Sequence, residues 1–162
     1  MYRMMIVDDE ERIANSIYDL MDERFEFELY RCYSAVEALE VIRMRFDIVI
    51  TDIAMPGMSG LELLNKVQAI WPKCHFLILT AYDSFDYAYE TLRHDRVDYL
   101  LKIESYDTIC QCVERKLQSI RKERAREENR ESRETWLIVR INQYIEQHYQ
   151  EDLTLTRLAD EV

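Results

Sequence analysis

Five side chains that could act on a phosphate group stand directly after short apolar runs in this sequence. They are three carboxylates, a hydroxyl and an amine: Asp8, Asp9, Asp52, Thr80 and Lys102. Carboxylates that lie together repel one another and favour a cation, and an all-oxygen set of ligands suits Mg²⁺. A divalent ion, an ammonium and a hydroxyl around one carboxylate would stabilise a phosphoryl group during transfer to that carboxylate. These residue types predict a Mg²⁺ site and phosphoryl-transfer chemistry, provided that the fold brings them together.

The segment around Asp52 has the pattern of a strand that ends in a turn. Residues 48–50 are β-branched, which is typical of a strand buried on both faces of a parallel sheet. Pro56 and Gly57 favour the turn that follows, and Ser59 can cap the next helix. Asp52 is therefore expected at the carboxyl end of a strand, the edge at which ligands bind in open α/β sheets.

Apolar periodicity predicts that strands and helices alternate along the first 120 residues. The expected strands are residues 2–7, 25–33, 48–52, 76–79 and 97–101. The expected helices include residues 13–21, 35–44, 61–67, 85–92 and the segment from 106 onwards. This order predicts an α/β fold with a doubly wound five-stranded parallel sheet, whose strand ends would bring the five polar residues to one edge.

Each of these polar residues also has a structural explanation. Asp8 could cap a helix, Thr80 could stabilise a turn, and Lys102 could be a solvated strand end. Glu10 and Glu11 complete a run of four acids, and the positive end of a helix macrodipole accounts for them. These explanations remain open for each residue alone, but they do not account for the whole set standing at strand ends.

Composition narrows the class of protein. The chain has 162 residues, enough for one hydrophobic core and an additional segment. Its net charge of −11 disfavours nucleic-acid binding by these residues. No stretch has the roughly 20 apolar residues of a membrane span, and no signal peptide is recognisable, so a cytoplasmic protein without membrane contact is expected. The cysteines lack the spacing of a zinc site and are expected to be buried free thiols: Cys32, Cys74, Cys110 and Cys112.

Four motifs occur in order within residues 1–120. They are Val-Asp-Asp-Glu at 7–10, Asp52 followed by Met-Pro-Gly-Met-Ser-Gly at 55–60, Leu-Thr-Ala at 79–81, and Asp-Tyr-Leu-Leu-Lys at 98–102. Together they resemble the receiver domain of response regulators in bacterial two-component signalling. The resemblance implies that a sensor histidine kinase donates a phosphoryl group to Asp52. It also implies a phospho-accepting switch rather than an enzyme, one that at most catalyses its own phosphorylation and dephosphorylation.

The resemblance also implies the metal ligands and the switch residues. Asp9, Asp52 and the backbone carbonyl of Ala54 would bind Mg²⁺ directly, and Asp8 would act through water.

Lys102 would pair with the phosphoryl group, Thr80 would move to hydrogen-bond it, and Tyr99 would turn inward in concert. Added charge and acceptor oxygens would draw the hydroxyl and free space for the aromatic ring. The switching face would consist of the fourth helix, the fifth strand and the fifth helix.

Two positions depart from the usual receiver pattern. Ile103 follows Lys102 where the family usually has a proline in a cis peptide, so the loop is either trans and differently shaped or strained. Residues 94–97 read His-Asp-Arg-Val where the family usually has a Gly-Ala pair, which predicts a differently built turn. Aromatic residues are also dense near the fourth helix, where core packing and an interaction surface are both open: Tyr82, Phe85, Tyr87 and Tyr89.

Residues 121–135 form a charged segment after the predicted receiver. Ala125 is the only apolar residue there, and pairs such as Arg130 and Glu134 stand at helical spacing. A solvated helical linker and a dimerising coiled coil are both open. A homodimer through the fourth and fifth helices and the linker is expected, with its stability drawn from the apolar flanks at 113–120 and 136–145.

Residues 136–162 resemble the opening of an AraC-type helix-turn-helix domain. The expected organisation is a receiver at 1–120, a charged helical linker at 121–135 and a short all-α piece at 136–162. We therefore expect part of a transcriptional regulator, in which DNA would be bound only through the rest of the C-terminal domain.

Two rival functions are also compatible with the sequence. One is a receiver fold that serves as a constitutive dimerisation module without control by phosphorylation. The other is a Mg²⁺-dependent phosphatase of the haloacid dehalogenase type, although that family requires a second acid where this chain has Ala54. The sequence does not identify the kinase, the stimulus or the target genes.

Overall fold

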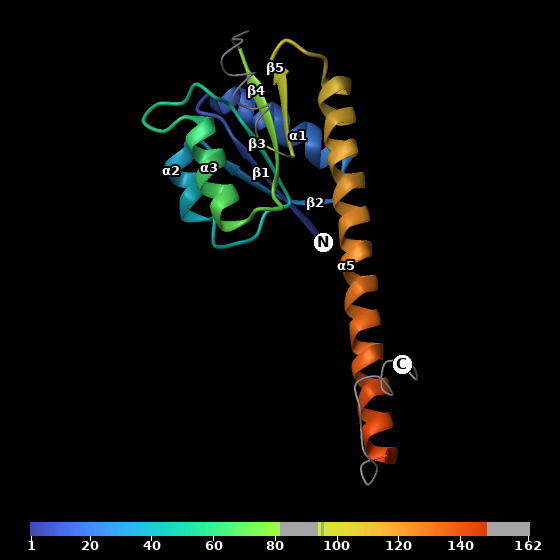
Figure 1. Ribbon diagram of the computed structural model, residues 1–162. Helices are drawn as coiled ribbons and strands as arrows, with labels where there is room; N and C mark the ends of the chain where they lie inside the picture. The colour runs from blue at the N-terminus through green and yellow to red at the C-terminus, as the bar shows by residue number, and fades with distance from the viewer. Residues whose placement is uncertain (82–93, 95, 149–162) are drawn as a thin grey trace. The chain divides into compact units, whose positions relative to one another are not determined.

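The computed structural model describes residues 1–81, 94 and 96–148. A five-stranded parallel sheet forms the centre of residues 1–118, in the order β2-β1-β3-β4-β5 (Figure 1). The strands are β1 (Tyr2–Val7), β2 (Phe27–Cys32), β3 (Ile48–Thr51), β4 (His75–Thr80) and β5 (Val97–Leu101). The helices are α1 (Glu11–Arg24), α2 (Ala35–Glu40), α3 (Gly60–Ile70) and α5 (Tyr106–His148). The predicted doubly wound five-stranded sheet is confirmed.

Helices cover the sheet on both faces, which explains why its central strands are apolar throughout. All four residues of β3 and all six of β4 are buried. Residues of α2 and α3, such as Ala38 and Leu64, pack with Val49 and Phe76 on one face. Figure 1 shows α1 on the other face. A continuous β-branched run is therefore the expected sequence for β3.

Two elements are shorter than predicted. The helix expected over 35–44 ends at Glu40, and the Trp71 indole N–H donates to the Ile42 carbonyl at 2.9 Å, a group that a continuing helix would use itself. The strand expected over 25–33 begins only at Phe27, because the Phe25 amide donates to the Met21 carbonyl at the end of α1. The helix predicted over 85–92 and the aromatic residues near it lie outside the described residues.

The turn between β3 and α3 has the predicted chemistry. Gly57 has a φ of 81°, a conformation that glycine adopts without steric cost. Ser59 and Glu62 form a capping box, in which the Ser59 hydroxyl accepts the Glu62 amide and the Glu62 carboxylate accepts the Ser59 amide. Asp52 and the start of α3 are thus held at opposite ends of a short, well-defined turn.

The chain divides into two compact units, residues 1–118 and 119–162. Helix α5 runs without interruption through the predicted linker, and Arg130 and Glu134 form the expected ion pair at 3.3 Å. Among the described side chains of its second half, four large apolar ones are exposed: Trp136, Ile138, Val139 and Ile145. The break and second helix predicted after Gln150 lie outside the described residues. Within the described part of the chain, no helix is apolar over a length that would cross a bilayer.

Candidate phosphoryl-acceptor site

The site lies where the strand order reverses. Strands β1 and β3 are neighbours, and the chain leaves them toward opposite faces of the sheet, so their carboxyl ends are the place where ligands bind in open α/β sheets. Asp8 and Asp9 follow β1, and Asp52 follows β3, with the Asp52 amide donating to the Val7 carbonyl at 3.0 Å. One carboxylate oxygen from each of the three residues lies within 4.8 Å of the others. The predicted acidic cluster therefore forms.

Asp52 is buried and held by its own turn. Its side chain is 7% exposed, and its Oδ1 accepts the amides of Ile53 at 2.7 Å and Ala54 at 3.4 Å. Its Oδ2 instead faces Lys102. The two oxygens of Asp52 therefore differ, since one accepts backbone amides and the other faces the Lys102 ammonium.

Gly60 is required where α3 meets the Asp52 backbone. A Cβ at this position would lie 1.9 Å from the Asp52 carbonyl oxygen, a distance that real Cβ atoms do not adopt. The Gly60 amide donates to the Ile53 carbonyl at 3.0 Å. The close approach of these two backbones fixes where Asp52 stands.

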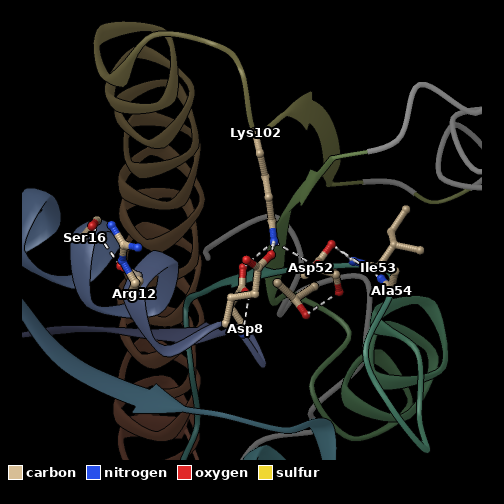
Figure 2. A network of polar contacts seen from close by, with 9 residues as sticks. Asp8, Arg12, Ser16, Asp52, Ile53, Ala54 and Lys102 are labelled. Carbon is tan, nitrogen blue, oxygen red and sulfur yellow. Dashed lines mark hydrogen bonds and ion pairs between the residues drawn. The ribbon is translucent and has the colours of Figure 1, made fainter.

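Lys102 reaches from the end of β5 between the carboxylates, as Figure 2 shows. Its Nζ lies 2.9 Å from both Asp8 Oδ2 and Asp52 Oδ2. Burial alone would lower the pKa of Lys102, but the hydrogen bonds and charges of Asp8 and Asp52 raise the pKa above its ordinary value. Burial raises the pKa of Asp8, although Lys102 and the Glu10 amide act in the opposite direction. The lysine is therefore a permanent cation at the centre of the site.

Asp9 is the carboxylate that suits an external cation. It is exposed and forms no hydrogen bond or ion pair with the residues that the structure describes, whereas both Asp8 and Asp52 are bonded to Lys102. Three carboxylates near one ammonium leave an excess of negative charge, and hard oxygen ligands at this spacing fit Mg²⁺. The donor set therefore fits the predicted metal. Ala54, whose carbonyl is the remaining predicted ligand, follows in the same turn and is exposed.

The two predicted switch residues occupy neighbouring strands. Thr80 ends β4 with its side chain fully buried, and its carbonyl accepts the Lys102 amide at 2.7 Å. Tyr99 lies in β5 opposite Ile78, is half-buried and packs against the core between the sheet and α2 and α3. Their movement on phosphorylation remains a prediction.

The residues that depart from the usual receiver pattern are accommodated locally. The Lys102–Ile103 peptide is trans, as are all peptide bonds in the described ranges, and Lys102 still reaches both carboxylates. Arg96 takes a φ of 72° in the turn before β5. Its carbonyl accepts the Phe76 amide at 2.9 Å and the buried Lys116 ammonium at 3.2 Å. Hydrogen bonds thus hold Arg96 in a conformation that glycine adopts more easily.

Glu10 is a neighbour of the site that the sequence pattern did not identify. The macrodipole of α1 accounts for an acid at this position, yet Glu10 Oε1 also lies 3.4 Å from Lys102 Nζ. Its place immediately after the acidic pair, at the same strand end, is the signal that could have identified it. All four cysteines are buried and free, as predicted, and none belongs to the site.

Comparisons with known proteins agree on one family. The family model for the response regulator receiver domain matches residues 4–114. The chain is 36% identical over 105 residues to the uncharacterized transcriptional regulatory protein YesN of Bacillus subtilis strain 168, covering 63% of this chain and 28% of that protein. It is 36% identical over 106 residues to the transcriptional regulatory protein HptR of Staphylococcus aureus strain N315, covering 63% of this chain and 41% of HptR. The chain thus matches less than half the length of these curated relatives.

A solved structure supports the same assignment. The CheY-like receiver domain protein of Methanospirillum hungatei JF-1 superposes with a TM-score of 0.70 at 27% identity, over 76% of this chain and 98% of that one. The chain belongs to the response regulator receiver domain family.

Proposed function

We propose that this receiver domain accepts a phosphoryl group on Asp52 from a sensor histidine kinase. One oxygen of Asp52 forms a bond to phosphorus while the bond from phosphorus to the kinase imidazole nitrogen breaks, and the electron pair of that bond stays on the nitrogen. Lys102 stabilises the negative charge on the transferred group, and Thr80 donates a hydrogen bond to it. The domain is thus a switch that at most catalyses its own phosphorylation and dephosphorylation.

A divalent cation completes the proposed site. Asp9, Asp52 and the carbonyl of Ala54 would hold Mg²⁺, with Asp8 acting through water. When bound, the ion would neutralise charge on the phosphoryl oxygens. Asp8 also holds Lys102 in place through its Oδ2.

One observation carries the proposal: the Asp52 carboxylate lies 2.9 Å from the Lys102 ammonium and within 4.8 Å of two further carboxylates. Such an arrangement combines a buried nucleophile, a fixed cation and a place for a second cation. These are the elements that phosphoryl transfer requires, because its catalysis is mostly positioning and charge neutralisation.

Intact-mass measurement tests the proposal. The chain is incubated with acetyl phosphate and Mg²⁺, and we expect a mass gain of one phosphoryl group. The gain should be absent in Asp52→Asn, which keeps the shape of the side chain, and absent when EDTA removes the ion. An unmodified wild-type chain under these conditions would leave constitutive dimerisation as the better account, and steady release of phosphate from phosphomonoesters would favour a phosphatase.

We further propose that phosphorylation controls a dimeric transcriptional regulator. The relatives named above are called transcriptional regulatory proteins, and exposed apolar residues lie along the second half of α5. Phosphorylation at Asp52 would shift Thr80 and Tyr99, alter the face formed by the fourth helix, β5 and α5, and change how two copies pair. DNA would be bound by an AraC-type domain that begins within residues 136–162. Binding of the full-length regulator to promoter DNA, compared with and without acetyl phosphate, tests this output.

A further inference from the structure

The Lys102 ammonium has three carboxylate neighbours, and one of them is outside the predicted set. Asp8 Oδ2 and Asp52 Oδ2 each lie 2.9 Å from Nζ, and Glu10 Oε1 lies 3.4 Å from it. An ammonium has three N–H donors, so these three acceptors occupy all of them. Before the bond to phosphorus forms, Asp52 is still a carboxylate, so Lys102 must release one of the three acceptors to bind an oxygen of the incoming phosphoryl group.

Exposure identifies Glu10 as the partner that is released. The side chains of Asp8 and Asp52 are 6% and 7% exposed, and Lys102 itself is 10% exposed, whereas Glu10 is 62% exposed. Separating Lys102 from a buried carboxylate leaves a buried charge without its partner, which is costly. Glu10 returns to water instead, and an exposed ion pair loses little when it separates.

Helix capping does not explain the Glu10 side chain. Glu10 is the N-cap residue of α1, but its side chain forms no capping hydrogen bond. Its backbone amide instead donates to Asp8 Oδ1 at 2.9 Å, which ties Glu10 to one of the carboxylates of the site. The Glu10 carboxylate is therefore free to reach Lys102.

We propose that Glu10 is a positioning residue that competes with the phosphoryl group for the Lys102 ammonium. The inference rests on the proposed phosphorylation of Asp52. Glu10 forms no bond to phosphorus and acts only through Lys102. By occupying one N–H of the lysine, it slows phosphorylation of Asp52 and shortens the lifetime of the phosphorylated domain.

Three variants distinguish the effect of the contact between Glu10 and Lys102 from the effect of net charge. Glu10→Gln removes the charge, and Glu10→Asp keeps the charge but withdraws the carboxylate from Lys102. Glu11→Gln is the matched control, because Glu11 is an exposed acid at the start of α1. Each variant is phosphorylated with acetyl phosphate at saturating Mg²⁺, the donor is then removed, and both time courses are followed by intact mass.

We expect Glu10→Gln and Glu10→Asp to be phosphorylated faster and to lose the group more slowly than the wild type. Each change should be about two- to fivefold, the factor that an exposed ion pair provides. Beryllofluoride mimics a phosphoryl group and binds without a phosphodonor. In calorimetry with Mg²⁺, it should bind both variants more tightly than the wild type by a similar factor. Glu11→Gln should match the wild type in every measurement.

Three results would overturn the inference: no change in Glu10→Gln, an equal change in Glu11→Gln, or wild-type behaviour of Glu10→Asp beside a changed Glu10→Gln. The last two would assign the effect to net charge rather than to contact with Lys102. The failure of the proposed function itself looks different, because the wild-type chain would then gain no phosphoryl group at all.

Discussion

At the scale of single residues, the site contains more carboxylates than its one ammonium can neutralise. Lys102 pairs with Asp8 and Asp52, while Asp9 stands within 4.8 Å of both without a partner among the described residues. Like charges at this distance oppose the compact state. The domain therefore carries an unfavourable electrostatic interaction that a bound cation would relieve.

Removing the Asp9 charge should stabilise the domain. In EDTA, we expect Asp9→Asn to raise the free energy of unfolding by about 1 kcal/mol, because repulsion within the cluster falls. Mg²⁺ should stabilise the wild type by mass action and have little effect on the variant. Urea unfolding with and without Mg²⁺ measures both effects, and Asp19→Asn, an exposed acid of α1, controls for net charge. Equal Mg²⁺ stabilisation of wild type and Asp9→Asn would remove Asp9 from the metal site.

A second ion pair lies away from the acidic site. Lys116 is buried, and its Nζ lies 2.9 Å from Asp98 Oδ2 and donates to the Arg96 carbonyl. Burial alone would raise the pKa of Asp98, but the hydrogen bond and charge of Lys116 lower that pKa below its ordinary 3.8. The pair joins β5 to α5 and supports the turn at Arg96.

This pair should make stability depend on pH. Because the pKa of Asp98 is lower in the folded state, its contribution is present above pH 3.8 and is lost as the pH falls through the folded pKa. At pH 7 we expect Asp98→Asn to cost about 1–2 kcal/mol, since it removes the carboxylate beside the buried Lys116 charge, while water screens the Asp98 side chain, which is 40% exposed. Urea unfolding from pH 7 to pH 3 should show the difference from wild type shrinking as the acid limit is approached. A constant difference would contradict the assignment, and Lys116→Met, which removes the buried charge, should cost less than Asp98→Asn at pH 7.

At the scale of elements, the β3–α3 turn connects a helix terminus to the proposed nucleophile. The capping box at Ser59 starts α3, and Gly60 lets its first turn rest directly on the Asp52 carbonyl. Any side chain at residue 60 must displace either the helix or the strand end.

Glycine substitutions in this turn should distinguish the need for a close backbone approach, at Gly60, from the need for a positive φ, at Gly57. Gly60→Ala should cost about 3 kcal/mol or more and reduce phosphorylation of Asp52, because the added Cβ meets backbone. Gly57→Ala meets nothing within 4 Å and has only the cost of a φ of 81°, about 1 kcal/mol. Thermal unfolding and intact-mass phosphorylation test the pair, and equal effects of the two substitutions would refute the role of the close approach.

The sequence predicted the elements better than their ends. β1 and β5 match their predicted bounds, and the alternation of strands and helices was enough to bring Asp8, Asp9, Asp52 and Lys102 to one edge. The early end of α2 could not be predicted, because the Trp71 indole that bonds Ile42 comes from a distant part of the chain. Glu10 was missed for a similar reason, since its partner Lys102 lies 92 residues away.

At the scale of the whole molecule, the chain is strongly acidic and exposes apolar residues in its second unit. A net charge of −11 favours solubility, whereas Trp136, Ile138, Val139 and Ile145 together favour association. A second copy of the chain is the partner we propose for these residues.

A charged substitution on this part of α5 should weaken the proposed dimer without disturbing the receiver. Ile138 is 59% exposed, so Ile138→Glu should change the stability of residues 1–118 little while raising the dimer dissociation constant about tenfold or more. Sedimentation velocity, with and without acetyl phosphate, measures the effect. Asn142→Glu adds the same charge at an exposed polar position as a control. If Ile138→Glu associates as the wild type does, the second half of α5 is not the dimer interface, and the receiver face becomes the candidate interface.

The two tryptophans give each unit its own optical reporter. Trp71 lies against the receiver core with its indole N–H bonded to the Ile42 carbonyl, whereas Trp136 is 52% exposed with Arg140 above its ring. Fluorescence from the first should shift to longer wavelength when the sheet unfolds, and fluorescence from the second should shift to shorter wavelength when another chain covers it. Two single Trp→Phe variants, each keeping one tryptophan, would therefore allow folding and association to be followed separately, without any added dye.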